Sequence, residues 1–197
     1  MTYEQFQQRY QYNPSTDLLT EKGNISIYKA YDVYFDIWVI IKKSKVSMLS
    51  SQSYSLKEEA TLLDSLPLHA NIIHYSDYYT FSLLGDSYDF AISQYYELGN
   101  LEDSIQKHDI SFGIKESILQ QLLDGIEFLH SQGIIHGSLI PTHILLDYDG
   151  GYIPKISHFS HSASIMDNDS TILMNIFQEE AVNYVSPEQL NGCLLYT

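Results

Sequence analysis

The chain has 197 residues, enough for one large or two small compact units with a buried core. Its 10 basic and 25 acidic residues give a net charge of -15, which repels nucleic acid and anionic membranes, so neither is expected as a partner. A single cysteine, Cys193, excludes an internal disulfide framework and favours a reducing, cytoplasmic location. No apolar run approaches membrane-spanning length, and the opening residues lack the layout of a signal peptide.

The first half of the chain contains four patterned segments. In chain order they are residues 25–32 (ISIYKAYD), 39–42 (VIIK), 56–66 (LKEEATLLDSL) and 69–73 (HANII). Apolar residues in segment 56–66 recur at the spacing of one helical face. This segment therefore predicts a helix.

The second half predicts a further helix and a hairpin. Residues 119–130 place Leu119, Leu122, Ile126 and Leu129 on one side of an amphipathic helix. Residues 147–151 (DYDGG) have the aspartate and glycine content of a tight turn, which predicts a hairpin between two short strands.

Three motifs in the second half carry the strongest signal, and they read HGSLIPTHILL (136–146), KISHFS (155–160) and NYVSPE (183–188). They resemble the catalytic loop HRDLKPxNILL, the metal-binding DFG and the closing APE of protein kinases. The earlier segments resemble the second strand, the VAIK strand, helix C and the HPNIV motif, and residues 89–101 resemble the fifth strand and the hinge. Because these motifs follow one another in the family's order, the chain resembles the protein kinase-like superfamily.

The resemblance implies an α+β fold with the two lobes of a protein kinase. We expect an N-lobe with an antiparallel sheet and helix C over residues 1–96, and a partial, helical C-lobe over residues 97–197. Residues 160–184 would form the activation segment. The helices that follow the APE motif in the family have no counterpart before Thr197, so we expect either a fragment or a lobe completed by another chain.

The catalytic positions of the family are occupied by unsuitable side chains. Ser138 stands where the aspartate accepts a proton, and Ile140 stands where a lysine neutralises the transferred phosphoryl group. His143 and His158 replace the two magnesium ligands, although magnesium prefers oxygen. The chain therefore resembles the catalytically inactive pseudokinases, which implies that it is not an enzyme and that it has no cofactor and no metal.

The glycine-rich phosphate loop is also lost. The glycine positions of GxGxxG are taken by Thr20, Lys22 and Ile25, whose side chains obstruct a close approach of phosphate to the backbone. Gly23 is displaced from the pattern and fits a turn. We expect ATP binding to be weak or absent.

The resemblance nevertheless implies a degenerate nucleotide pocket. Lys42 aligns with the phosphate-contacting lysine, with Lys43 as the alternative register, and Glu59 aligns with the helix C glutamate. We expect an ion pair between Lys42 and Glu59. Ser93 takes the gatekeeper position and Tyr95 lies in the hinge, and a side chain as small as serine leaves room behind the adenine pocket.

The two histidines leave a second interpretation open. They either fill space and form local hydrogen bonds, which we expect, or face each other across the old metal site and bind a softer ion such as zinc.

Two classes of function follow. The favoured one is a non-catalytic module that binds a protein, either an active kinase or another copy of itself, as a scaffold or allosteric regulator. The alternative is an atypical ATP-binding serine/threonine kinase-like enzyme or a nucleotide sensor that holds ATP through Lys42. The 17 tyrosines, many within residues 28–34 and 74–96, either pack in strands or form an aromatic protein-binding surface.

Overall fold

The computed structural model describes residues 1–46, 55–107, 110–164 and 184. The chain divides into two compact units. Residues 1–50, 55–65 and 74–95 form the first, and residues 51–54, 66–73 and 96–197 form the second. The expected activation segment beyond residue 164, the APE-like motif except Tyr184, and Cys193 lie outside the described residues.

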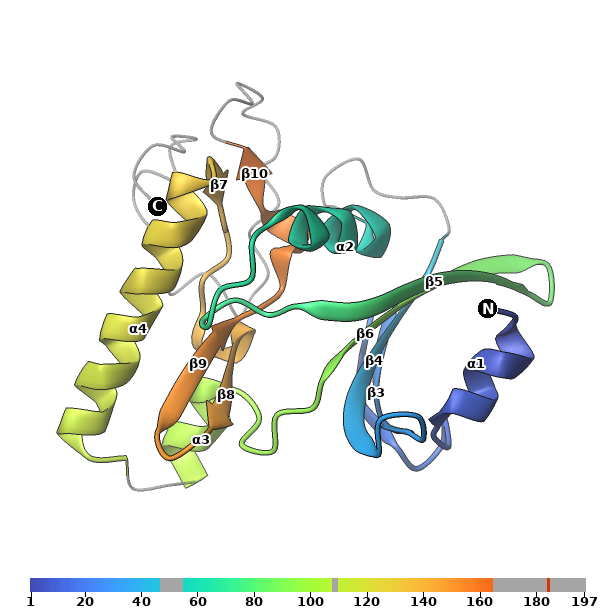
Figure 1. Ribbon diagram of the computed structural model, residues 1–197, viewed down its shortest axis with the longest axis horizontal. Coiled ribbons are helices and arrows are strands. Elements are labelled where there is room, and N and C mark those ends of the chain that lie inside the picture. The colour runs from blue at the N-terminus through green and yellow to red at the C-terminus, as the bar shows by residue number, and fades with distance from the viewer. Residues whose placement is uncertain (47–54, 108–109, 165–183, 185–197) are drawn as a thin grey trace. The chain divides into compact units, whose positions relative to one another are not determined.

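The first unit is built on an antiparallel sheet of six strands (Figure 1). Its spatial order is β1-β3-β4-β6-β5, and β2 also pairs with β3. The strands are β1 (Tyr10–Gln11), β2 (Leu18–Lys22), β3 (Ile25–Asp32), β4 (Ile37–Lys45), β5 (Tyr75–Leu83) and β6 (Asp86–Gln94). An antiparallel sheet accompanied by a helix is the α+β arrangement expected for a kinase N-lobe.

Two helices cover the two faces of this sheet. Neighbouring residues in a strand point to opposite faces, so Ile41 and Lys42 of β4 do so too. Ile41 packs in a cluster with residues of helix α1 (Tyr3–Arg9), whereas Lys42 reaches helix α2 (Leu56–Ser65). Helix α2 confirms the helix expected over 56–66.

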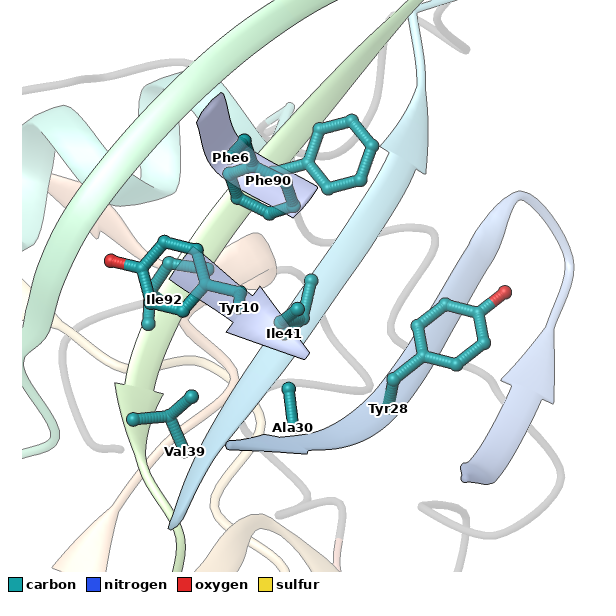
Figure 2. Packing of buried hydrophobic residues seen from close by; sticks show 8 residues of the cluster. All are labelled: Phe6, Tyr10, Tyr28, Ala30, Val39, Ile41, Phe90 and Ile92. Atoms are coloured by element: carbon teal, nitrogen blue, oxygen red, sulfur yellow. The ribbon is translucent and has the colours of Figure 1, made fainter. Parts of the chain in front are cut away.

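Four of the eight residues in the cluster beneath α1 are aromatic (Figure 2). The Phe6 ring lies 5.1 Å from the Phe90 ring and 4.9 Å from the Tyr10 ring, and all three residues are at most 1% exposed. Burial of one such side chain stabilises a fold by about 1.5–3 kcal/mol. The cluster consists of Phe6, Tyr10, Tyr28, Ala30, Val39, Ile41, Phe90 and Ile92.

Helix α1 was not anticipated from the sequence, although a local signal for it exists. The Thr2 hydroxyl accepts a hydrogen bond from the Gln5 amide (3.2 Å), and the Thr2 amide donates to the Gln5 side chain (2.9 Å). This capping box satisfies two amide groups that the first turn of a helix leaves unpaired.

A buried ion pair fixes the end of α1 to the last residue of β3, Asp32. The Arg9 guanidinium donates two hydrogen bonds to Asp32 Oδ2, at 3.0 and 2.8 Å, and its Nη2 also lies 3.1 Å from Asp77. Tyr10 donates to the same Asp77 carboxylate at 2.7 Å. Burial, followed by this hydrogen bond, raises the pKa of Tyr10.

In its described residues the second unit contains two α-helices, two short antiparallel strand pairs and two 3-10 turns. Its elements are α3 (Leu101–Lys107), α4 (Phe112–Ser131), β7 (Ile134–Ile135), η1 (Pro141–His143), β8 (Ile144–Tyr148), β9 (Tyr152–Ile156), η2 (Phe159–His161) and β10 (Ala163–Ser164). Helix α4 and the β8–β9 hairpin confirm the helix over 119–130 and the turn at 147–151.

Helix α4 lies very close to β9 because Gly125 has no side chain. A Cβ at Gly125 would lie 3.1 Å from Ile156 Cδ1 and 3.2 Å from Asn71 Cβ. The Asn71 amide donates to the Pro154 carbonyl at 3.0 Å, which ties segment 66–73 to the same strand. No helix in the described part of the chain is long and apolar enough to cross a membrane.

Candidate functional site

The expected ion pair between Lys42 and Glu59 is present in the first unit. Lys42 Nζ lies 2.6 Å from Glu59 Oε2, and the two side chains are only 8% and 1% exposed. The Tyr75 hydroxyl donates to the other carboxylate oxygen of Glu59 at 3.0 Å. Burial and the nearby Glu59 charge raise the pKa of Tyr75 well above its usual value, so it remains a neutral donor.

Lys43, the alternative register, does not join this pair. It lies on the opposite face of β4, where its amine is 4.5 Å from the centre of the Tyr88 ring. Burial lowers the pKa of Lys43. Lys42 is therefore the lysine that faces helix α2.

The two residues predicted for the gatekeeper and hinge positions stand at the end of β6. Ser93 is 2% exposed and lies opposite Ile40 in the register of β4 and β6. Tyr95 donates its amide to the Trp38 carbonyl at 3.4 Å, and the Lys29 amine lies 4.1 Å from the centre of its ring. Their role in nucleotide binding stays a prediction.

In the second unit, the expected catalytic loop is held by a histidine and a glycine. His136 Nε2 hydrogen bonds with the Ser157 carbonyl at 2.8 Å, and its ring meets the Phe159 ring edge to face at 4.8 Å. Gly137 has φ +77°, and a Cβ there would lie 2.4 Å from the His161 carbonyl oxygen. The loop backbone therefore accepts only glycine at this position without rearrangement.

Two of the replaced catalytic positions are buried. Ser138 and Ile140 are each 5% exposed. A lysine at position 140 would bring a charge into a site that isoleucine fills as an apolar side chain. Ser138 offers a hydroxyl, which is not ionised near neutral pH, in place of a carboxylate.

The two histidines at the magnesium positions stack on each other. The rings of His143 and His158 have centres 4.4 Å apart and planes inclined by 9°. An imidazole binds a metal through a lone pair in the plane of its ring, at about 2.0–2.1 Å for zinc. In two stacked rings these lone pairs lie in parallel planes. They therefore do not converge on one ion. Among the described residues, no group of three or more His, Cys, Asp or Glu side chains could hold a metal.

Hydrogen bonds fix which nitrogen of each ring carries the proton. His143 Nδ1 lies 2.8 Å from the Ser138 carbonyl, which can only accept, so this nitrogen is the donor. Ser157 gives its one hydroxyl proton to the His143 carbonyl at 2.7 Å. His158 Nδ1, which lies 2.9 Å from the Ser157 hydroxyl, must therefore donate as well. Both rings are thus engaged in local hydrogen bonds, as the first of the two interpretations predicted.

The backbone at the DFG-like motif is unusual. His158 has φ +65° and ψ +60°, the left-handed region, in which histidine is found more readily than bulkier residues. The next residue, Phe159, is fully buried against His136. The packing residue of this motif therefore keeps its buried place, while its contact with helix C stays a prediction.

Comparison with known proteins identifies the family. Residues 22–196 match the protein kinase domain family. The chain is 29% identical over 139 residues to the serine/threonine-protein kinase STE20 of Saccharomyces cerevisiae, a match that covers 71% of this chain and 14% of that protein. It is 34% identical over 111 residues to the kinase chk1 of Schizosaccharomyces pombe, covering 54% of this chain and 21% of that protein. The kinase pak-1 of Caenorhabditis elegans is 27% identical over 140 residues, covering 71% and 23%.

These relatives correct one expectation. The inference that the chain is not an enzyme is wrong, because its relatives are named serine/threonine-protein kinases. The error came from weighing four replaced side chains, Ser138, Ile140, His143 and His158, above a likeness that extends along most of the chain. The matches span 14–23% of the three relatives' own lengths. The chain belongs to the protein kinase domain family.

Proposed function

We propose that this kinase-family domain acts chiefly as a pseudokinase-type module that binds a protein partner and serves as its scaffold or allosteric regulator. The observation that carries the proposal is the stacked pair of His143 and His158. These rings occupy both positions where the family binds magnesium, and they contact each other, the Ser138 carbonyl and the Ser157 hydroxyl instead. Protein binding needs none of the groups that handle phosphate.

The expected partner is a protein, and the expected location of the chain is the cytoplasm. An active kinase or a second copy of the chain would suit a regulator of this family, whereas a net charge of -15 disfavours nucleic acid and anionic membranes. A cytoplasmic location remains the expectation for a chain with one cysteine.

A second candidate function rests on the Lys42–Glu59 pair. In an atypical serine/threonine kinase or a nucleotide sensor, this pair would hold the lysine amine in place for a nucleotide phosphate. The pair is formed and buried, which favours retention of some nucleotide contact.

A titration with ATP, with and without magnesium, tests these proposals. For the partner-binding module we expect no change in melting temperature with ATP, whether or not magnesium is present. Stabilisation by ATP that is lost in Lys42→Met but kept in the control Lys43→Met would support the second candidate. Phosphate transfer that disappears in Lys42→Met would overturn the first.

A further inference from the structure

The turn between β3 and β4 exposes an unusual number of large apolar side chains. Tyr34 and Phe35 are each 68% exposed, and Ile37 at the start of β4 is 48% exposed. With Asp36, which lies among them, these residues are called the hairpin patch. Contiguous exposed apolar surface of this kind marks a site of interaction more often than isolated exposed residues do.

We propose that the hairpin patch binds an arginine-containing, basic and apolar segment of a partner protein. This inference deepens the proposed function, on which it rests, by naming the surface and the chemistry of the partner. Of the tyrosine-rich segment 28–34, it assigns Tyr34 to the aromatic protein-binding surface that the sequence left as an alternative, whereas Tyr28 packs in the core.

The patch is held in one conformation by bonds within the first unit. Asp32 accepts a hydrogen bond from the Tyr34 amide at 2.9 Å, and its carbonyl accepts another from the Asp36 amide at 2.9 Å. The Tyr31 hydroxyl donates to the Asp36 carboxylate. Arg9 holds Asp32 in place through the buried ion pair between the two side chains. A preformed surface loses little conformational entropy when a partner binds.

The aromatic rings of the patch already attract a cation of the chain itself. The Arg9 guanidinium carbon lies 5.4 Å from the centre of the Tyr34 ring and 5.3 Å from that of Phe35. Each ring is about half or more exposed, so part of its surface remains open to solvent. A second cation can approach there, since the electrostatic attraction acts on both faces of a ring.

Charge selects the kind of partner. Asp36 is the charged member of the patch, and Asp32 behind it is paired with Arg9. A chain with net charge -15 attracts a basic partner more strongly than an acidic partner or a second copy of itself. A basic segment is attracted, and arginine suits this surface better than lysine because its planar group stacks on rings and is more weakly hydrated.

Fluorescence anisotropy with a labelled peptide of alternating arginine and leucine tests the proposal at physiological salt. We expect the whole chain to bind this peptide about tenfold more weakly as the double variant Tyr34→Ser, Phe35→Ser, since two ring contacts are lost. Ile37→Ser, which touches no part of the Arg9 pair, should also weaken binding. Asp36→Asn keeps a residue that tolerates the left-handed backbone and removes the charge, so it should weaken binding as well.

The matched control is Phe112→Ser on helix α4, an aromatic residue that is 76% exposed and lies in the second unit. Its binding should equal that of the parent chain. Replacing the arginines of the peptide by lysine should weaken its binding to the parent chain. The same replacement should weaken binding to the double variant only a little, because this variant already lacks the two rings. Unchanged melting temperatures would show that the variants are folded.

Three outcomes would overturn this inference. They are equal affinity in all patch variants and in Phe112→Ser, equal affinity for the arginine and lysine peptides, and self-association by light scattering that the double variant abolishes. The last result would identify a second copy as the occupant and leave the proposed function intact. Phosphate transfer dependent on Lys42 would instead overturn the proposed function, whatever the peptide does.

Discussion

At position 137 the loop backbone leaves no room for a side chain. Gly137 combines a left-handed φ of +77° with a carbonyl of His161 that a Cβ would meet at 2.4 Å. The neighbouring residues Ser138 and His143 are linked through the backbone of the same loop. The loop thus differs from the family motif HRDLKPxNILL here too, since it has a glycine where the motif has an arginine, at a point where its backbone leaves no room for a Cβ.

We expect Gly137→Ala to lower the free energy of unfolding by at least about 2 kcal/mol, because both the strained backbone and the overlap with a carbonyl are unfavourable. Urea unfolding measures this change. Gly151→Ala is the control, since a Cβ there meets no atom within 4 Å. Equal unfolding midpoints for the two variants would show that the loop can move away from His161.

Individual residues were predictable where the family's order fixed them. Lys42 and Glu59 were paired from their place in the motifs, and Lys43 was left as an alternative that strand alternation then excluded. The stacking of His143 on His158 was foreseen only as two residues that could face each other. The proton position on His143 depends on the Ser138 carbonyl and that on His158 depends on the Ser157 hydroxyl, and no sequence pattern specifies these partners.

At the scale of elements, helix α1 has the clearest consequence for stability. It is only seven residues long, too short to be stable alone, so tertiary packing must hold it. Phe6 supplies much of that packing with Tyr10 and Phe90, and Arg9 supplies a buried charge pair.

Phe6→Ala should lower the free energy of unfolding of the first unit by about 3–5 kcal/mol, because it opens a cavity among aromatic rings. Thermal unfolding followed by near-UV circular dichroism reports on this environment. The control Phe112→Ala, at a residue that is 76% exposed, should change stability by less than about 0.5 kcal/mol. A similar small effect for Phe6→Ala would mean that α1 is detached in solution.

The elements predicted well are those with strong local periodicity, namely α2, α4 and the β8–β9 hairpin. The first strands were recognised by likeness alone, since their pairing depends on contacts between distant residues. Helix α1 was missed although Thr2 and Gln5 form a capping box, because seven residues give too few turns for an apolar stripe to stand out.

At the scale of the whole molecule, the buried tyrosines make the stability of the fold depend on pH. Burial raises the pKa of Tyr10, Tyr12, Tyr75 and Tyr78, and it raises the pKa of Tyr96 to about 12. Tyr96 belongs to the second unit and the other four to the first, so each unit holds at least one tyrosine that resists ionisation.

Stability should therefore fall in alkaline solution. A tyrosine ionises near pH 10 in the unfolded chain but at a higher pH in the folded one, so the folded state binds more protons above about pH 10. The stabilising contribution is complete below about pH 10 and is lost as pH rises through the folded values. Unfolding midpoints measured between neutral pH and pH 12 should decline only in the alkaline part of this range. Full ionisation of all tyrosines near pH 10 in a still folded chain would contradict this.

The match to the kinase family begins at residue 22, whereas the packing of the first unit begins at Tyr3. A version of the protein trimmed to the family match would lose Phe6 and Tyr10, and it would uncover Ile41, Phe90 and Ile92 on the face they cover. It would also leave Asp32 buried without Arg9. The family match therefore begins later in the chain than the residues that pack in the first unit. A trimmed chain that precipitates on expression would say nothing about the function of the intact one.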